Sequence, residues 1–545
     1  MVMLLLVAGC RKDSTIDGML IVSESMRGDS KAMVDDLSLN WVAGESIRIN
    51  GEDMNIVVNG ENQAYIENVP TSSVYRALYP ATLNNSALLD TDNVTVTIPD
   101  TYTYTVNDGK QVLEVPMAAR STDGSRLYFK HLTAAITVEI TNYYGFAVLV
   151  DSVVVTSSDA GTPYQISGVT NINLTNDSMG ITLNSSPTAA QKKVKMLFGD
   201  GTHALKIDQG ATKKVQVPVL PVGNGNKFSI SVTVHKDGDA AVTKTFIKTQ
   251  VTGGAMGRAK MAYAGHTVGF LFSLSSTKKA IISQGNLQYN KSTKVWSLAN
   301  NQYGTTEYVG QDVGTDYAYQ NIVTLFGWGT SGWNNGNEKF LPYNTTTSGS
   351  NATGNGYGPT DGASYTFDLT ASYANADWGV YNNISNGGNN LWRTMTAGTS
   401  NSSCEWYYLL YIRPVYNSLM ANAKYTMATI GGTYKGVIIF PDDYNHPSDT
   451  DFSGSRFNSS SNFTSNVSIA GWKKMEAAGA VFLPAAGCRA AATVSNTGTE
   501  CRYWSVTMAG NDVAFATKFN KDAVSTTFAS KRQHGCSVRL VMDVR

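Results

Sequence analysis

Residues 133–142 read TAAITVEITN, and this stretch decides the fold class of the chain around it. Apolar side chains at Ile136, Val138 and Ile140 alternate with polar ones, which is the period of two of a half-buried β-strand. Residues 228–234 repeat the pattern with Phe, Ile and Val. Further β-rich runs, each bounded by turn residues, are 94–98, 148–155, 215–220 and 246–251. No useful stretch of helical period interrupts residues 18–268, so the sequence predicts β-sandwiches, two in series.

Length and composition fit several such units. The chain has 545 residues, which suggests roughly three or four domains. Its 50 Gly and 28 Tyr are typical of short strands joined by polar turns. With 42 basic and 42 acidic side chains the net charge is zero, so no overall field favours nucleic acid, and nucleic-acid binding is not expected.

The first ten residues carry a targeting signal. Residues 1–8 form an apolar run that is too short to span a bilayer and that ends in small residues before Cys10. Residues 6–10, LVAGC, resemble a lipobox, which implies cleavage before Cys10 and acylation of that cysteine, for example with palmitate. We therefore expect a signal peptide and a lipoprotein anchored in the outer membrane and displayed at the cell surface.

Four short motifs then resemble, in order, the fimbrillin (Mfa-like) family of Bacteroidetes. They are WVAGESI at 41–47, YRALYP at 75–80, VPMAA at 115–119 and LYFKHL at 127–132. The resemblance covers roughly residues 18–268 and implies two transthyretin-like β-sandwiches of a pilus subunit. In that family a protease removes the first strand after an arginine, and a neighbouring subunit supplies a replacement strand.

Arg27 is the candidate for such cleavage, because it follows the apolar strand 19–22. Arg48 is a poorer candidate, since it lies inside the strand motif 41–49.

The second half resembles a different family. Residues 282–289 (ISQGNLQY), 325–332 (LFGWGTSG), 479–487 (GAVFLPAAG) and 535–541 (GCSVRLV) are similar, in order, to the major paralogous (FISUMP-type) domain of gut bacteria. That family is related to C-type lectins and formylglycine-generating enzymes, which implies a compact α+β fold with long loops. The predicted organisation is an anchor segment at 1–17, fimbrillin sandwiches at 18–120 and 121–268, and a C-type-lectin-like domain at 269–545.

Two short helices are expected in this last part. Trp406, Leu409 and Leu410 recur at helical spacing, and Pro414 must end that helix. A second helix at 472–476 precedes an apolar strand at 481–483.

Four cysteines in the last part suggest two disulfides in an exported protein. Three pairings of Cys404, Cys488, Cys501 and Cys536 are possible. Cys488 and Cys501 flank a 12-residue loop, whose closure would stabilise the fold by about 3 kcal/mol. That would leave Cys404 to join Cys536, in the way that C-type lectins tie their first helix to their final strand. No cysteine or histidine spacing predicts a zinc site, and neither a metal nor another cofactor is predicted.

No catalytic motif occurs in a suitable context, so an enzyme is not predicted. Cys501 and Cys536 are too far apart in sequence for the active-site cysteine pair of the formylglycine-generating enzymes. Asp442 and Asp443 form the best carboxylate pair, but adjacent residues on extended backbone point apart, which favours a turn.

Ligand binding is the remaining expectation. The complete calcium and sugar motifs of C-type lectins are absent. Aromatic side chains in or beside the long loops could stack on a sugar or anchor a protein, and the candidates are Trp333, Tyr343 and Tyr357. Trp328 and Trp392 lie inside family motifs and are expected in the core.

The leading hypothesis is a fimbrial tip adhesin that binds other subunits by strand exchange. Residues 537–544 read as a closing strand of the last domain and so cannot be donated. Its lectin-like domain would mediate cell adhesion through a glycan or a surface protein of host or bacterium. The alternatives are a stand-alone glycan-binding lipoprotein of a nutrient-uptake system and a purely structural pilin.

Overall fold

The computed structural model describes most of the chain. The described residues are 15–16, 19–23, 27–28, 41, 44–57, 63–83, 89–107, 109–157, 164–175, 179–224, 226–252, 255–304, 321–333, 367–398, 401–416, 422–454, 458, 462–490 and 493–544.

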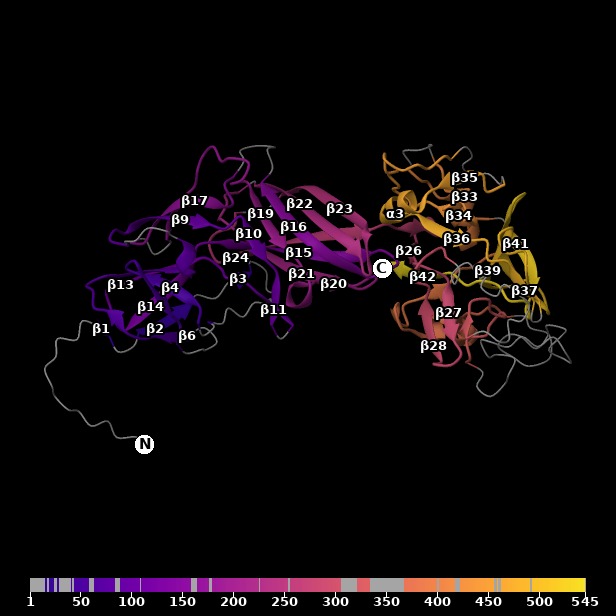
Figure 1. Ribbon diagram of the computed structural model, residues 1–545, viewed down its shortest axis with the longest axis horizontal. Coiled ribbons are helices and arrows are strands. Elements are labelled where there is room, and N and C mark those ends of the chain that lie inside the picture. The colour runs from indigo at the N-terminus through magenta and orange to yellow at the C-terminus, as the bar shows by residue number, and fades with distance from the viewer. Residues whose placement is uncertain are drawn as a thin grey trace, which may run out of the picture.

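The molecule is mainly β and elongated, with three parts along its long axis (Figure 1). An N-terminal part lies at one end, a long-stranded sandwich lies in the middle and a C-terminal part lies at the other end. This confirms the predicted fold class at the level of a mainly β protein.

A seven-stranded sheet organises the N-terminal part. Its strands, in spatial order, are β5 (Glu52–Asn55), β4 (Ser46–Ile49), β8 (Tyr75–Tyr79), β13 (Met117–Ser121), β14 (Arg126–His131), β2 (Met19–Ser23) and β6 (Gln63–Ile66). One core includes Met19, Ile21, Trp41 and Phe129. Trp41 meets Tyr79 and Phe129 edge to face, with ring centroids 5.0 and 5.3 Å away, which is a favoured aromatic geometry.

A smaller sheet extends this part with strands from two distant segments. Its order is β18 (Gly180–Thr182), β17 (Gly168–Asn173) and β9 (Asn93–Ile98). Its apolar face shares a core with Leu78 of β8 and Ala118 of β13. Strand pairing therefore crosses residue 121, because β17 lies beyond it and pairs β9. The domain boundaries themselves stay predictions.

The central part is a two-sheet sandwich around one core of Val, Ile and aromatic side chains. One sheet has the order β10 (Thr101–Thr103), β19 (Lys193–Leu197), β16 (Val148–Ser157), β22 (Lys227–Lys236) and β23 (Asp239–Thr252), with β20 (Lys206–Ile207) beside β16. The other has the order β21 (Thr212–Val219), β15 (Ala134–Tyr143), β24 (Lys260–Gly269) and β3 (Arg27–Gly28). β15 buries Ile136, Val138 and Ile140, and β22 alternates buried and half-buried residues, so both period-two predictions are confirmed.

The C-terminal part contains several small sheets and short helices. One sheet has the order β25 (Phe272–Ser273), β26 (Lys279–Ile282), β42 (Leu540–Val544) and β32 (Arg393–Thr394). Another has the order β29 (Ile322–Val323), β27 (Leu287–Asn290), β28 (Val295–Leu298), β30 (Asn383–Ile384) and β31 (Gly388–Asn389). A third has the order β35 (Ser465–Val467), β33 (Tyr425–Ile430), β34 (Tyr434–Ile439) and β36 (Val481–Pro484). The remaining strands are β37 (Cys488–Ala490) with β38 (Thr493–Ser495), and β39 (Glu500–Met508) with β40 (Val513–Asn520) and β41 (Val524–Lys531).

Both predicted helices are present. α3 (Ile469–Ala477) begins at the Ser468 cap, whose hydroxyl accepts from the Gly471 N–H, and it precedes β36. α2 (Glu405–Tyr407) continues into the π-helical turn η8 (Tyr408–Ile412), which ends before Pro414 as expected. The turn is wider than an α-helix because the Arg413 N–H donates to the Tyr408 carbonyl five residues back.

Candidate assembly and ligand-binding sites

β2 is an interior strand of the N-terminal sheet. It pairs β14 in parallel on one side and β6 in antiparallel on the other. Met19 and Ile21 point into the core with none of their surface exposed, whereas Leu20 and Val22 are half-buried. Removing β2 would therefore leave an apolar slot between two strands with unpaired backbone groups, which is the kind of site that another β-strand can fill.

Arg27 lies in β3, which pairs β24 of the central sandwich, with Arg27 opposite Lys260. The chain thus passes from the N-terminal sheet to the sandwich directly after β2. Cleavage after Arg27 requires this short pairing to open, because a protease binds extended, unpaired backbone. Arg48 lies in β4 and forms an ion pair with Asp53 at 2.6 Å.

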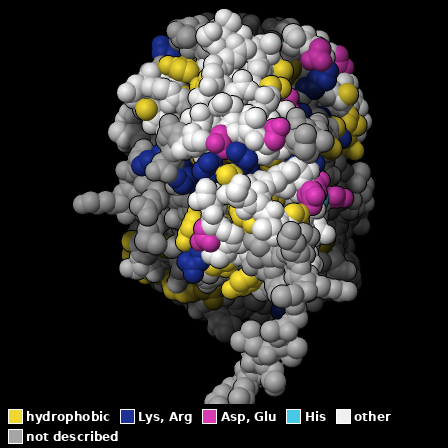
Figure 2. Space-filling model, turned by 90° about the vertical axis from the view of Figure 1, so that its left-hand side faces the viewer, with side chains coloured by type: hydrophobic (Ala, Val, Ile, Leu, Met, Phe, Trp, Pro, Cys, Tyr) yellow, Lys and Arg dark blue, Asp and Glu magenta, His cyan; other side chains and the backbone are white. Residues whose placement is uncertain are grey.

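Charged side chains of both signs lie near one another on the N-terminal end of the molecule (Figure 2). Arg76 and Arg120 both bind Asp92, at 2.7 and 2.9 Å, and the two guanidinium groups hold the pKa of that carboxyl below its ordinary value although burial opposes them. Asp92 therefore offsets only one of the two positive charges in this cluster.

The last strand, β42, lies between two cores of the C-terminal part. It pairs β26 and β32 on its two edges. Leu540 and Met542 face one core, and Val541 faces the other. The expectation that residues 537–544 contain a closing strand is therefore confirmed. The end of the chain lies at the junction with the sandwich (Figure 1), where Met542 packs on Gly210 so tightly that a Cβ there would lie 2.9 Å from its Cε.

The junction between sandwich and C-terminal part is built from close backbone contact and buried polar groups. A Cβ on Gly145 would lie 2.0 Å from the Ile282 carbonyl oxygen, and the Gln284 N–H donates to the Gly145 carbonyl at 3.0 Å. The Tyr144 hydroxyl donates to the Ala477 carbonyl at the end of α3. Sequence reasoning missed this interface, because its members are far apart in the chain.

A buried ion pair lies in the same junction. Lys236 of β22 binds Glu476 of α3, Nζ to Oε1, at 2.9 Å, and each side chain is only 5% exposed. The Gln302 amide donates to the same oxygen at 3.1 Å, and the Lys236 ammonium lies 5.0 Å from the centre of the Phe146 ring. Both charges are therefore compensated inside the interface.

A polar cleft of about 650 Å³ opens beside this ion pair. Side chains of both parts line it, among them Lys206, Gln209, Asn300, Asn301, Asn386 and Leu391. The Gln209 amide donates to the Asn386 carbonyl at 2.9 Å, so the two walls are bridged. The size suits a small ligand, and amide, carboxylate and ammonium groups suit one rich in hydroxyls.

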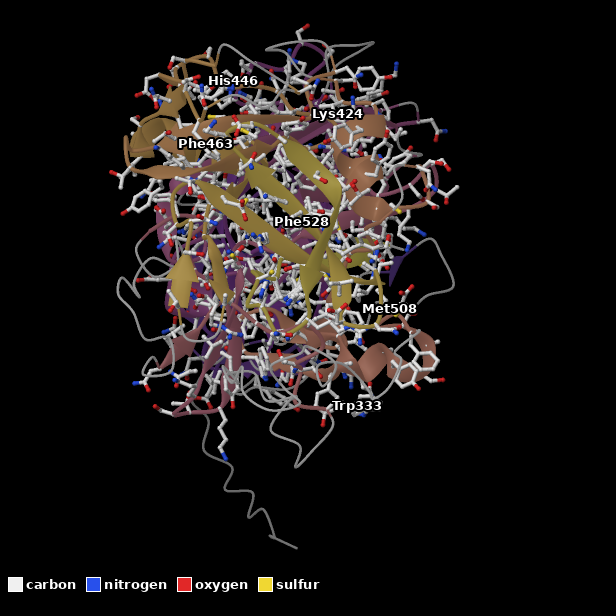
Figure 3. All side chains as sticks on the ribbon, turned by 90° about the vertical axis from the view of Figure 1, so that its right-hand side faces the viewer. Trp333, Lys424, His446, Phe463, Met508 and Phe528 are labelled. Atoms are coloured by element: carbon white, nitrogen blue, oxygen red, sulfur yellow. The ribbon has the colours of Figure 1, made fainter. Side chains whose placement is uncertain are left out.

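Trp333 lies at the lower edge of the C-terminal part in the end-on view (Figure 3). Trp333 is partly buried and meets Tyr373 edge to face at 6.4 Å, and Tyr373 packs on Phe367 at 4.5 Å. Phe367 is 40% exposed, so this aromatic cluster reaches the surface. Trp328 and Trp392 are buried, as expected. The other two ligand-binding candidates, Tyr343 and Tyr357, and the lipidation candidate Cys10 lie outside the described residues.

A second aromatic group lies over the sheet β39–β41 at the centre of this end (Figure 3). Arg502 and Lys518 each lie 4.7 Å from the centre of the Phe528 ring, and Glu500 binds both cations at 2.7 and 3.0 Å. Alternation along three strands brings these residues to one face, and the sequence gives no local signal for it.

The four cysteines of the C-terminal part are buried thiols, and no disulfide joins them. The predicted pairs Cys488–Cys501 and Cys404–Cys536 are therefore not formed in this structure. Cys404 and Cys536 lie in different places in the fold. Cys404 lies near Gly398 at the start of α2, whereas Cys536 lies in the core with Phe326 and Trp504. Cys501 faces a different core, with Tyr503 and Phe519, and burial raises the pKa of its thiol well above the ordinary value.

Asp442 and Asp443 lie in a turn, as expected, and only Asp442 is buried. Its carboxylate binds the fully buried Arg413 at 2.9 Å and accepts from the Ser273 N–H and hydroxyl. This is a structural ion pair that holds η8 to β25, and the two carboxylates do not share a site.

In the part of the chain that the structure describes, no three His, Cys, Asp or Glu side chains are grouped to hold a metal ion. No helix among the described residues is both long and apolar enough to span a membrane.

Comparison with known proteins gives distant likenesses among solved structures. No family model and no curated protein matches the chain. Similar solved structures include a proposed cell adhesion protein of Bacteroides uniformis, with 14% identity, a TM-score of 0.27 and 47% of this chain against 94% of that chain covered. Another from Bacteroides ovatus has 12% identity, a TM-score of 0.28 and coverage of 47% and 93%. A fimbrial protein of Bacteroides vulgatus has 9% identity, a TM-score of 0.20 and coverage of 46% and 95%.

These identities and TM-scores are too low to decide fold or function. The strands themselves define a mainly β protein with a sandwich at its centre.

Proposed function

We propose that this chain is a cell-surface fimbrial subunit at the tip of a fibre, anchored first through acylated Cys10 and then docked by strand exchange. Its C-terminal part would present the aromatic cluster of Trp333, Tyr373 and Phe367 to a glycan or to a protein on another surface. The observation that carries the proposal is the contrast between two strands. β2 occupies an interior slot near the start of the chain, whereas β42 is held between two cores.

The slot supports acceptance of a strand. Residues up to Arg27 contain β2 but only one residue of β3, Arg27 itself, so their removal would vacate the slot and leave most of the sandwich sheet paired. A donor needs apolar residues at the positions of Met19 and Ile21, because both are fully buried.

The position of β42 argues against donation. Withdrawing it would expose Leu540, Val541 and Met542 and separate β26 from β32. A subunit that accepts a strand but keeps its last one belongs at the end of a fibre.

Assembly is tested by limited trypsin treatment of the full chain, followed by mass spectrometry. We expect a product beginning at Gly28 that binds a labelled peptide of residues 15–27, whereas untreated protein does not. An Arg27→Gln variant should resist this cleavage and bind no peptide. Peptide binding by the untreated chain, or none by the trimmed chain, would contradict strand acceptance.

Adhesion is tested separately, with the full chain on a glycan array and on host matrix proteins, with and without calcium. Tyr381, another partly exposed aromatic residue, on α1 (Trp378–Tyr381), serves as the control. Binding that is lost in Trp333→Ala and kept in Tyr381→Ala would support the aromatic cluster around Trp333 as the binding surface. Binding that Trp333→Ala leaves unchanged would exclude Trp333 from the site.

One observation favours the alternative of a stand-alone glycan-binding lipoprotein. The polar cleft at the junction could hold a sugar without any fibre. That reading predicts a chain that stays acylated at Cys10 in cells and a glycan affinity that falls in Asn301→Ala rather than in Trp333→Ala.

A further inference from the structure

Cys488 and Cys536 lie opposite each other on paired backbone. Their neighbours Arg489 and Gly535 form an antiparallel bridge and exchange both hydrogen bonds, each at 2.9 Å. In such a ladder the next pair of residues, Cys488 and Cys536, occupies a non-hydrogen-bonded position. Side chains there lie on the same face, and the Cα atoms are about 4.5 Å apart.

The backbone around Cys536 agrees with this register. Its own N–H and carbonyl bind Phe326 on the other side, at 3.0 and 2.9 Å, so they point away from Cys488. Cα atoms that face each other at such a position fall within the range that a disulfide bridges, about 4.4–6.8 Å.

The electrostatic surroundings of the two cysteines agree with this proximity. The Arg502 guanidinium interacts with both Cys488 and Cys536, which raises its own pKa against the effect of burial. Both sulfurs also lie 3.9 Å from serine hydroxyls, Ser495 for Cys488 and Ser530 for Cys536. Rotation about each Cα–Cβ bond would redirect the sulfurs from these serines toward each other.

We propose that Cys488 and Cys536 form a cross-strand disulfide, and that this bond fastens the segment leading into β42 to the β37–β38 hairpin. The two thiols lose two protons and two electrons, and an external disulfide such as oxidised glutathione or a disulfide-bonded oxidase takes them up as two thiols. Cys404 lies near Gly398 and Cys501 faces a different core, so these two thiols stay reduced.

Burial sets when the bond forms. It raises the pKa of the Cys536 thiol to about 12, although Arg502 and Arg489 oppose the shift. The thiolate is the species that attacks a disulfide, so the folded reduced protein should react slowly. Oxidation therefore belongs to folding, before the strand pair closes, and the finished bond is shielded from reductants.

The test compares full-length protein refolded with a mixture of oxidised and reduced glutathione against protein refolded in excess reductant. After alkylation and non-reducing digestion, we expect a peptide pair that links Cys488 to Cys536 in the first sample only. Reductant added after folding should open it much more slowly than reductant added in denaturant.

Two variants separate this bond from the alternatives. Cys488→Ser should abolish the linked peptide pair and lower the thermal midpoint of the oxidised protein toward that of the reduced one, whereas Cys404→Ser should change neither. The peptide map of the unmutated chain decides the matter even where a variant folds poorly. A link between Cys488 and Cys501 or between Cys404 and Cys536, or alkylation of both Cys488 and Cys536 after oxidative refolding, would overturn the proposal.

Discussion

His534 shows how burial and neighbouring charge act together on one side chain. It is half-buried, and its imidazole lies near Arg502, Lys531 and Arg489. Burial is the larger cause and the three cations add to it, so the pKa of His534 falls to about 4. The cationic form of this ring is therefore disfavoured in the folded chain.

This shift predicts a dependence of stability on pH. An unfolded histidine binds its proton near pH 6.5, so between about pH 4 and 6.5 the unfolded state holds more protons than the folded state. The free energy of unfolding should therefore fall as the pH drops through this window. His534→Gln should remove about 1 kcal/mol of that loss, a figure that allows for the partial exposure of the ring.

Urea unfolding of both proteins at pH 7 and near pH 4.5 measures the difference. A loss of stability on acidification that is equal in the two proteins would show that His534 contributes nothing to it.

Two adjacent carboxylates give a second residue-scale prediction. Burial lowers the pKa of Arg413 to about 10 although Asp442 opposes it, so this guanidinium depends on its partner. Asp442→Asn should lower the free energy of unfolding by about 3–5 kcal/mol, because it leaves a buried cation without its counter-charge. Asp443→Asn, on the exposed neighbour, should change it by no more than about 0.5 kcal/mol. Thermal and urea unfolding of both variants checks the contrast, and equal losses would contradict it.

At the scale of elements, β2 contributes to stability mainly through one face. Ile21 is fully buried in the N-terminal core and Leu20 is half-buried on the other face. Ile21→Ala should cost about 2–4 kcal/mol through lost burial and a cavity, and Leu20→Ala should cost about 1 kcal/mol or less. Equilibrium unfolding of the untrimmed chain measures both. Equal costs would mean that β2 does not occupy the slot as an ordinary core strand.

The same elements show what sequence alone could predict. The strands β15 and β22 were predictable because a period of two is a local signal that burial on one face imposes. α3 was predictable for the same reason at helical period, but not the pairing of its Glu476 with Lys236. The cross-strand position of Cys488 and Cys536 likewise depends on a long-range register, which sequence spacing alone does not reveal. Arg27 was a candidate because it follows the apolar strand 19–22, and Trp333 because it lies in or beside a long loop, and the roles of both stay predictions.

At the scale of the whole molecule, the junction decides whether the C-terminal part moves freely on the sandwich. Gly145 touches the Ile282 carbonyl, and a Cβ would overlap that backbone oxygen at 2.0 Å. Gly145→Ala should therefore loosen the junction, whereas Gly265→Ala, where a Cβ meets nothing within 4 Å, should not. Small-angle X-ray scattering should show a broader distribution of interatomic distances for Gly145→Ala alone. Identical distributions for both variants would mean that the contact does not set the geometry.

The ion pair in the junction gives the sharpest test of rigidity. Lys236→Met leaves the Glu476 carboxylate buried without its cation, which should cost about 3–5 kcal/mol and release the C-terminal part as a separately unfolding unit. The double variant Lys236→Met with Glu476→Leu removes both charges and should recover most of that loss, because two apolar side chains can fill a buried site. Lys473→Met, on α3 like Glu476, breaks a more exposed pair with Asp239 and should cost no more than about 1 kcal/mol.

Calorimetry distinguishes one unfolding transition from two, and limited proteolysis reports exposure of residues 269–271. If the double variant is as loose as the single one, the junction is held by its backbone contacts and not by the charge pair. In that case the rigidity of the junction would rest on the fit of Gly145 against Ile282.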